Sequence, residues 1–122
     1  MSSILVIGDS CTDIFVYGKT DRICPEAPVP VFNPTHQTEN GGMAKNVAAN
    51  LESMDAEGTL ITNTDNIIKT RFVDSKTNAM ILRVDENDTT GRIDRDVLLQ
   101  IEDNTYKGNK YDAIIISDYC KG

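Results

Sequence analysis

The sequence predicts an α/β fold, in which a parallel sheet with helices is joined by a small accessory β-sheet. Three observations predict it: the apolar run Ile4 to Ile7 that ends at Gly8-Asp9, the helical spacing of apolar residues from Ala44, and the apolar run Ala113 to Ser117 that ends at Asp118. Apolar runs without alternation are typical of strands buried on both faces, as in parallel sheets. Such strands separated by helices favour an α/β core.

Two extended segments are expected between the first strand and the helix. Asp13 to Tyr17 is bounded by Gly18, and Val29 to Asn33 carries prolines at 28 and 30. Prolines in these positions suit only an edge strand. The segment then leads to Gly41-Gly42, which we expect to form a turn that presents backbone N–H groups to a polar ligand.

Helical spacing of apolar residues predicts the first helix, with Ala44, Val47, Ala48, Leu51 and Met54 at i, i+3, i+4 and i+7 intervals. Thr59 to Thr62 is expected to return to the sheet as a short strand.

The next part of the chain predicts a hairpin of Ile67 to Val73 with Ala79 to Val84, followed by a helix over Asp94 to Glu102. Charged residues alternate with apolar ones in the first hairpin strand, which indicates a sheet with one solvated face. We expect one domain over residues 1–122, with accessory strands at about 13–33 and 67–84 inserted in the core. An exposed accessory sheet needs a ligand or a partner to cover it.

Composition excludes several classes of function. The chain of 122 residues has 19 acidic and 12 basic side chains and a formal net charge of −7, so neither nucleic acid nor an anionic membrane is an expected partner. Its apolar runs are too short to cross a bilayer, and no signal peptide is recognised. The scattered cysteines indicate a cytoplasmic protein with incidental thiols, Cys11, Cys24 and Cys120.

Five segments in order resemble the ribokinase/phosphofructokinase-B family of carbohydrate kinases: ILVIGDSCTDIFVYG, RICPEAPVPVF, GGMAKNVAANL, KTRFVDSKTNAMILRVDEND and DAIIISDYCKG. The PEAPVPV segment is most similar to the heptose-7-phosphate kinase domain of bacterial ADP-heptose synthase. The resemblance spans nearly the whole chain. It implies a partial ribokinase-like parallel sheet, with the accessory sheet as a lid over a sugar.

The resemblance also implies a site for a sugar or sugar phosphate. Asp13 matches the acidic residue that binds sugar hydroxyls, and Gly41, Gly42 and Asn46 match the GGxxxN motif that closes around the sugar. The Asn side chain offers both a donor and an acceptor, as a vicinal diol requires. For Asp13, a turn carboxylate that caps backbone N–H groups is the alternative.

Four further residues are implied in binding. Arg71 and Arg83 lie on the hairpin that resembles the lid, where either could contact a sugar phosphate or face solvent. Asp118 and Lys121 match an SDYxKG segment at the carboxyl end of a core strand, where α/β sheets place ligands. Lys121 is the expected phosphate contact there.

The chain departs from the family in its catalytic motifs. The Gly-Ala-Gly-Asp motif, which supplies the catalytic base, and the Asn-x-x-Glu motif of the magnesium site do not occur in the 122 residues. The strand and helix that normally precede the lid hairpin are missing between Ile61 and Ile67. We therefore expect a truncated, amino-terminal half without catalytic residues or a metal site, which transfers no phosphoryl group alone. ATP and Mg²⁺ are expected only if a carboxyl-terminal half completes it.

Two other functions are open. The exposed lid strands could pair in a homodimer, either alone or beside sugar binding and a complementing kinase half. ILVIGDSCTD also resembles the nucleophile block of SGNH-type esterases, with Ser10 as nucleophile. The only histidine, His36, lies outside the block that supplies the base in those enzymes, which disfavours this alternative.

Overall fold

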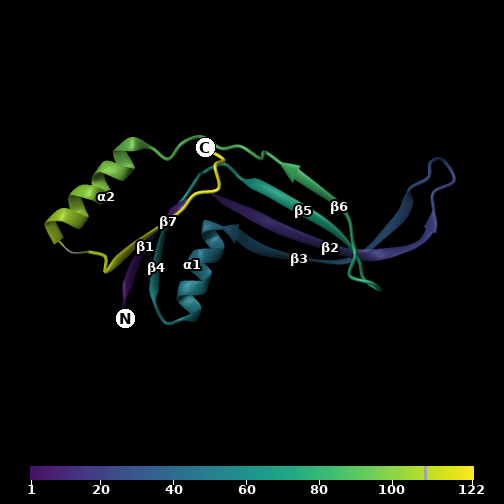
Figure 1. Ribbon diagram of the computed structural model, residues 1–122, viewed down its shortest axis with the longest axis horizontal. Helices are drawn as coiled ribbons and strands as arrows, with labels where there is room; N and C mark the ends of the chain where they lie inside the picture. Colours follow the sequence, from purple (N-terminus) through teal and green to yellow (C-terminus); the bar gives the residue numbers. More distant parts are fainter. Residues whose placement is uncertain (109) are drawn as a thin grey trace.

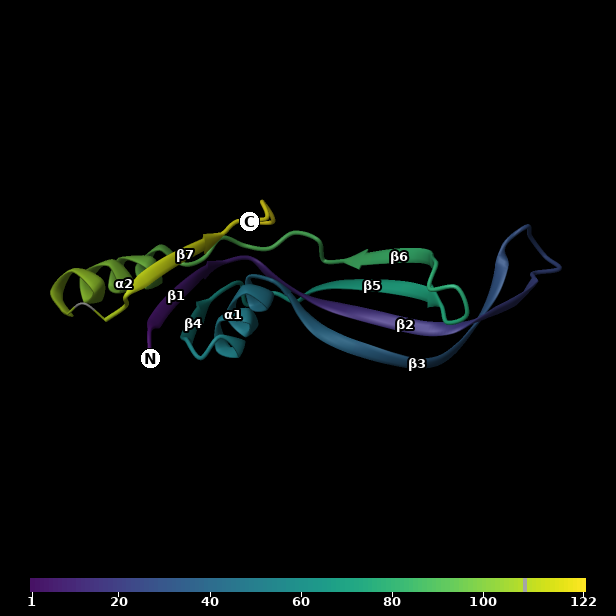
Figure 2. The same cartoon turned by 60° about the horizontal axis from the view of Figure 1, so that its bottom comes forward.

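In the computed structural model, which describes residues 1–108 and 110–122, two β-sheets lie end to end in an elongated molecule (Figures 1 and 2). One sheet is parallel and carries the two helices beside it. The other is long and mixed, and extends away from them. The order of elements along the chain is the one that the sequence predicts.

The parallel sheet has the strand order β4-β1-β7, with bounds Glu57–Ile61 for β4, Ser3–Gly8 for β1 and Ala113–Ser117 for β7. β1 is the central strand, and its consecutive residues Leu5 and Val6 are both 0% exposed. Because neighbouring side chains in a strand point to opposite faces, both faces of β1 are covered. The predicted buried strand at Ile4 to Ile7 is thus confirmed.

The prediction that β7 is buried is wrong. β7 is an edge strand that pairs with β1, and its Ile116 side chain is 76% exposed. An apolar run marks a strand but does not distinguish a central strand from an edge strand.

The mixed sheet has the order β3-β2-β5-β6, with bounds Pro30–Met43, Ser10–Ile23, Ile67–Asp74 and Met80–Glu86. β2 and β5 are parallel, and the two outer pairs are antiparallel. The prolines of β3 lie on an edge strand, and the hairpin of β5 and β6 forms as predicted. We call this sheet the lid sheet.

β2 and β3 are longer than predicted and reach beyond β5 and β6 (Figures 1 and 2). Gly18 does not end β2: the strand continues through it with a register shift. A Cβ atom at Gly18 would lie 2.5 Å from the Asn33 carbonyl oxygen and 2.6 Å from the Phe32 ring. The glycine is therefore a site of close packing between β2 and β3.

The glycine pair does not form the predicted turn. Gly41 and Gly42 directly precede Met43, the last residue of β3, and are paired with Thr12 and Cys11. The chain changes direction at Met43, whose φ is 58°. Helix α1 then runs over Ala44–Ser53, as the apolar spacing predicts. The Ala44 amide donates to the Asp9 carbonyl at 3.0 Å, which fixes the start of α1 beside the end of β1.

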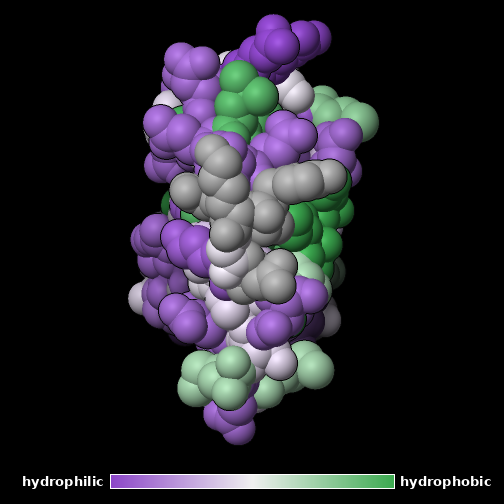
Figure 3. All heavy atoms as spheres, turned by 90° about the vertical axis from the view of Figure 1, so that its left-hand side faces the viewer, coloured by the Kyte–Doolittle hydropathy of each residue, from purple (hydrophilic) through white to green (hydrophobic). Residues whose placement is uncertain are grey.

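α1 lies beside β4, whereas helix α2, Arg95–Gly108, lies beyond β7 (Figures 1 and 2). Viewed from the end of the molecule where α2 lies, the surface is largely hydrophilic, with apolar side chains gathered on one flank (Figure 3). Exposed apolar residues of α2 and β7 are Val97, Leu98, Leu99, Ile114 and Ile116. Neither helix, within the part of the chain that is described, combines the length and apolarity needed to span a membrane.

Candidate functional site

Two rows of side chains cross one face of the lid sheet. In the first row, Asp13 on β2 neighbours Lys69 on β5, which lies opposite Asp85 on β6. In the second, Phe15 neighbours Arg71, which lies opposite Arg83. Residues two apart in a strand share a face, so both rows project to the same side.

Asp13 is fixed by an ion pair within this face. Its Oδ1 atom accepts a hydrogen bond from Arg71 Nη1 at 2.9 Å, and both side chains are 24% exposed. The Arg71 guanidinium carbon also lies 5.2 Å above the centre of the Phe15 ring. Asp13 lies inside a strand and bonds a side chain, so it does not cap a turn.

Gly42 brings the backbone of β3 against Asp13. A Cβ atom at Gly42 would lie 2.4 Å from Asp13 Oδ2 and 2.5 Å from Cys11 Sγ. Such distances are too short for a Cβ atom, so any other residue at this position would displace the Asp13 carboxylate or the Cys11 thiol.

A cavity of about 380 Å³ lies between the glycine pair and the first turn of α1. Asp13, Gly41, Gly42 and Asn46 all line it, together with Phe15, Asn40, Met43 and Ala49. The Asn46 side-chain amide makes no hydrogen bond within the described part of the chain. The structure thus brings these four predicted residues together around one space.

A second cavity, of about 420 Å³, shares Asp13 and Met43 with the first. We call it the cationic cavity, because four basic side chains line it. Its complete lining is Cys11, Asp13, Met43, Lys69, Arg71, Arg83, Tyr119 and Lys121. The predicted phosphate contacts Arg71, Arg83 and Lys121 therefore lie around one cavity.

The basic side chains are paired with carboxylates beside the cationic cavity. Arg83 makes a two-bond contact with Asp85, at 2.7 and 2.9 Å. Asp88 accepts from Lys69 at 3.1 Å and from Lys121 at 2.9 Å. Hydrogen bonds from Lys121 and Lys69 hold the pKa of Asp88 below its usual value, and the Arg83 contact lowers the pKa of Asp85.

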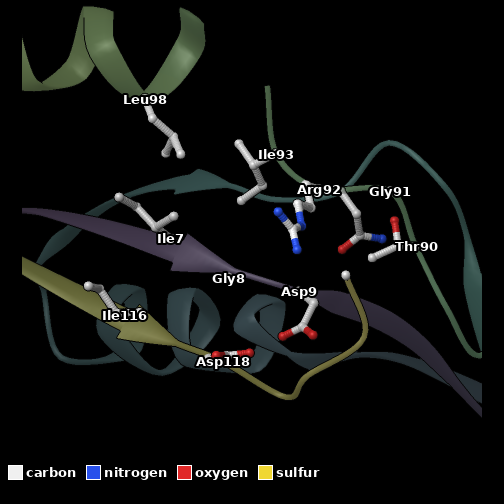
Figure 4. A pocket seen from close by; sticks show the side chains of 12 residues that line it. Ile7, Gly8, Asp9, Thr90, Gly91, Arg92, Ile93, Leu98, Ile116 and Asp118 are labelled. Atoms are coloured by element: carbon white, nitrogen blue, oxygen red, sulfur yellow. The ribbon is translucent and has the colours of Figure 1, made fainter. Parts of the chain in front are cut away.

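Asp118 lies apart from the other predicted residues. It lines a cavity of about 270 Å³ at the carboxyl end of the parallel sheet, with Asp9 and Arg92 toward one end and Ile7, Ile93 and Leu98 toward the other (Figure 4). One Asp118 oxygen accepts from the Cys120 amide at 2.8 Å. Asp9 bonds the amides of Tyr119 and Lys121, both at 2.7 Å, which holds the segment after β7 against the end of β1.

Sequence reasoning missed Lys69 and Asp88. The alternation of charged and apolar residues in β5 predicts that Lys69 lies on a solvated face, yet Lys69 is only 7% exposed. The parallel register of β5 with β2 places Lys69 beside Asp13. The alternation of residues within one strand contains no information about this register. Asp88 follows β6 in a connection that only the tertiary structure brings to Lys121.

Ser10 and His36 do not form the pair of nucleophile and general base that an esterase requires. Ser10 is 2% exposed, and its hydroxyl accepts from Thr62 at 2.6 Å. His36 instead stacks on Tyr17, with ring centres 4.8 Å apart.

Burial, followed by the Asp13 charge, raises the pKa of the Cys11 thiol, which lies next to Ser10 in β2. In the described residues, His, Cys, Asp and Glu form no group of three that could hold a metal ion.

Comparison with known proteins gives similarity to carbohydrate kinases. The protein named Bifunctional protein HldE of Koribacter versatilis is 33% identical over 148 aligned residues, which cover 98% of this chain and 30% of that protein. The HldE protein of a Helicobacter pylori strain is 34% identical over 152 residues, covering 100% of this chain and 32% of that protein. The chain thus spans about one-third of these curated relatives. No family model matches it.

The aligned length of 148 residues exceeds the 122 residues of the chain, so the relative has residues that this chain lacks within the matched region.

A solved carbohydrate kinase from Agrobacterium tumefaciens superposes with a TM-score of 0.53 and 15% identity, over 95% of this chain and 45% of that one. At this identity the likeness shows a shared fold.

Proposed function

The chain has a ribokinase-like α/β fold and resembles the ribokinase/phosphofructokinase-B carbohydrate kinases, and on that premise we propose that it recognises a sugar phosphate. The observation that carries the proposal is the cationic cavity. Four basic side chains line it in a chain whose net charge is −7. Basic side chains gathered at a cavity of an acidic chain favour an anionic ligand.

The sugar hydroxyls belong in the neighbouring cavity. Asp13 offers carboxylate oxygens as acceptors, and Asn46 offers a donor and an acceptor. Gly42 allows the β3 backbone to lie against Asp13, so a ligand there meets both side chains and main chain. Both cavities share Asp13, which allows one ligand to occupy them together.

The phosphate belongs among Lys69, Arg71, Arg83 and Lys121. Arginine matches phosphate oxygens through its planar set of donors, and lysine adds a compact charge. The lining side chains come from β5, β6 and the segment after β7, so binding would join the lid sheet to the core. By the resemblance, a heptose 7-phosphate is the first ligand to test.

The proposed role of these residues is recognition and not phosphoryl transfer. Transfer needs a base and charge stabilisation at the transferred group, and the Gly-Ala-Gly-Asp motif of the family is not among these 122 residues. A complementing kinase half would supply that chemistry, and ATP and Mg²⁺ enter the proposal only with it.

A second function, assembly of a homodimer, is favoured by the other face of the lid sheet. An apolar groove of about 530 Å³ lies there, lined by Val29, Pro30, Phe32, Pro34, Phe72, Ile81 and Leu82. Phe32 and Phe72 make an edge-to-face contact with ring centres 5.5 Å apart, while Leu82 is 56% exposed. A second copy would cover such a groove with the same apolar face.

Calorimetric titration tests the sugar-phosphate proposal. Pentose, hexose and heptose phosphates are titrated into the full chain without ATP, and Asp13→Ala is compared with the unchanged chain. Heat with one of these ligands, lost in Asp13→Ala, is the expected result. An absence of heat with all of them contradicts the proposal.

A further inference from the structure

Lys69 is a buried cation in the middle of the lid sheet. Its side chain is 9% exposed, and its ammonium group lies 3.1 Å from Asp88 and 3.5 Å from Asp85. A buried charge without a partner is strongly unfavourable, so these carboxylates are what allow Lys69 to remain charged there.

Lys121 comes to the same carboxylate from a distant part of the chain. It follows β7, and its ammonium group donates to Asp88 Oδ2 at 2.9 Å, while Lys69 donates to Oδ1. The connection between β6 and α2 holds this geometry through the backbone, because the Thr90 amide donates to the Lys121 carbonyl at 2.7 Å. Figure 1 shows the carboxyl-terminal segment running beside that connection. Asp88 thus joins a cation of the lid sheet to a cation of the core.

Asp88 does not obstruct the cationic cavity. Lys69 and Lys121 line the cavity, whereas Asp88 is not part of the lining and its side chain is 39% exposed. Each ammonium group has three donors, so both lysines keep at least one donor beyond the contacts to Asp88 and Asp85. Without the bridging carboxylate, two like charges held by one small region would repel each other.

We propose that Asp88 is a positioning residue that holds Lys69 and Lys121 together at the cavity wall, and so gives the site its preference for a phosphorylated sugar. The inference rests on the proposed function and adds to it the residue that determines the preference. Asp88 contacts the lysines and not the sugar, so its effect is confined to the phosphate.

The distinguishing readout is the ratio of two affinities. Heptose 7-phosphate and the same heptose without its phosphate are titrated into the full chain and into Asp88→Asn. The variant should bind the phosphorylated sugar roughly five- to tenfold more weakly, the size of the net contribution of one hydrogen bond, because one lysine contact to the phosphate is weakened. Affinity for the neutral heptose should be unchanged. Asp88→Glu keeps the charge, so its affinity for the phosphorylated sugar should lie between the affinities of Asp88→Asn and of the unchanged chain.

The matched control is Asp21→Asn, which removes the same charge from an exposed position on β2 and should leave both affinities unchanged. An unchanged preference in Asp88→Asn overturns the inference, as does Asp88→Glu behaving like Asp88→Asn. Loss of both affinities, or of the folded circular-dichroism spectrum, also overturns it, because Asp88 would then support the fold. If the unchanged chain binds neither sugar, the proposed function itself fails.

Discussion

Asp13 and Arg71 are joined across the parallel pair of β2 and β5 by a hydrogen bond of 2.9 Å. The pair lies where the two cavities meet, and both residues line the cationic cavity. Arg71 also stacks on Phe15. A single arginine therefore orients the carboxylate expected to bind hydroxyls and contributes to the wall expected to bind phosphate.

Replacement of Arg71 by lysine tests this double role. Lysine keeps the charge but lacks the planar fork and the stacking surface, so affinity for a sugar phosphate should fall roughly tenfold. Calorimetry measures the change, with Arg22→Lys on the exposed end of β2 as the control. Equal affinity in Arg71→Lys and the unchanged chain would show that the guanidinium has no part in the site.

A methyl group at Gly42 should disturb both stability and binding. It would meet Asp13 and Cys11 at 2.4 and 2.5 Å, so the free energy of unfolding should drop by about 1–3 kcal/mol, as for overpacking. Denaturant titration measures this. Gly108→Ala is the control, because a Cβ atom there would meet no atom within 4 Å. A Gly42→Ala variant as stable as that control would contradict the close approach of β3.

The β5–β6 turn should weaken in acid. Hydrogen bonds from Thr77 hold the pKa of Asp74 below its ordinary value of 3.8. A carboxylate with a lowered folded-state pKa contributes stability that is complete above the unfolded-state pKa and is lost as pH falls through the folded-state value.

Asp74→Asn should therefore lower the melting temperature at pH 6 and flatten its decline below pH 3.8. Thermal melts across this range measure both effects, and Asp21→Asn should show neither. A decline as steep in Asp74→Asn as in the unchanged chain refutes the assignment.

Leu82→Glu should prevent dimerisation while preserving the fold. The side chain is 56% exposed, so the substitution places a charge on the apolar groove and not in the core. Light scattering should give a dimer for the unchanged chain and a monomer for the variant. Met54→Glu, at a residue that is 74% exposed directly after α1, should remain dimeric. A monomeric unchanged chain at high concentration rules out this assembly.

Much of the fold follows from local patterns. The apolar spacing from Ala44 predicts α1, and the Ile4 to Ile7 run predicts the central strand. The exposure of Ile116 could not be predicted, because strand order is a property of pairing between segments and not of one segment. The prediction of a turn at Gly41-Gly42 was wrong for a related reason. Pairing with β2 extends β3 through Gly42, so the chain changes direction at Met43 instead.

Some residues of the candidate site can likewise be predicted from sequence motifs, whereas others are found only in the tertiary structure. Motif matching selects Asp13, Gly42 and Asn46, which the structure gathers around one cavity, and it also selects Asp118, which lies in another. Lys69 and Asp88 have no motif, because their importance comes from β2–β5 register and from a connection that meets the segment after β7. Long-range geometry is the part that a linear pattern lacks.

Mapping of amide chemical shifts during titration with heptose 7-phosphate tests the central claim most directly. The account predicts saturable shifts at Gly41, Gly42 and Asn46 together with Lys69, Arg71 and Lys121, since the two cavities share one ligand. Shifts confined to the surroundings of Arg92 and Asp118, or none at saturating ligand, would contradict it.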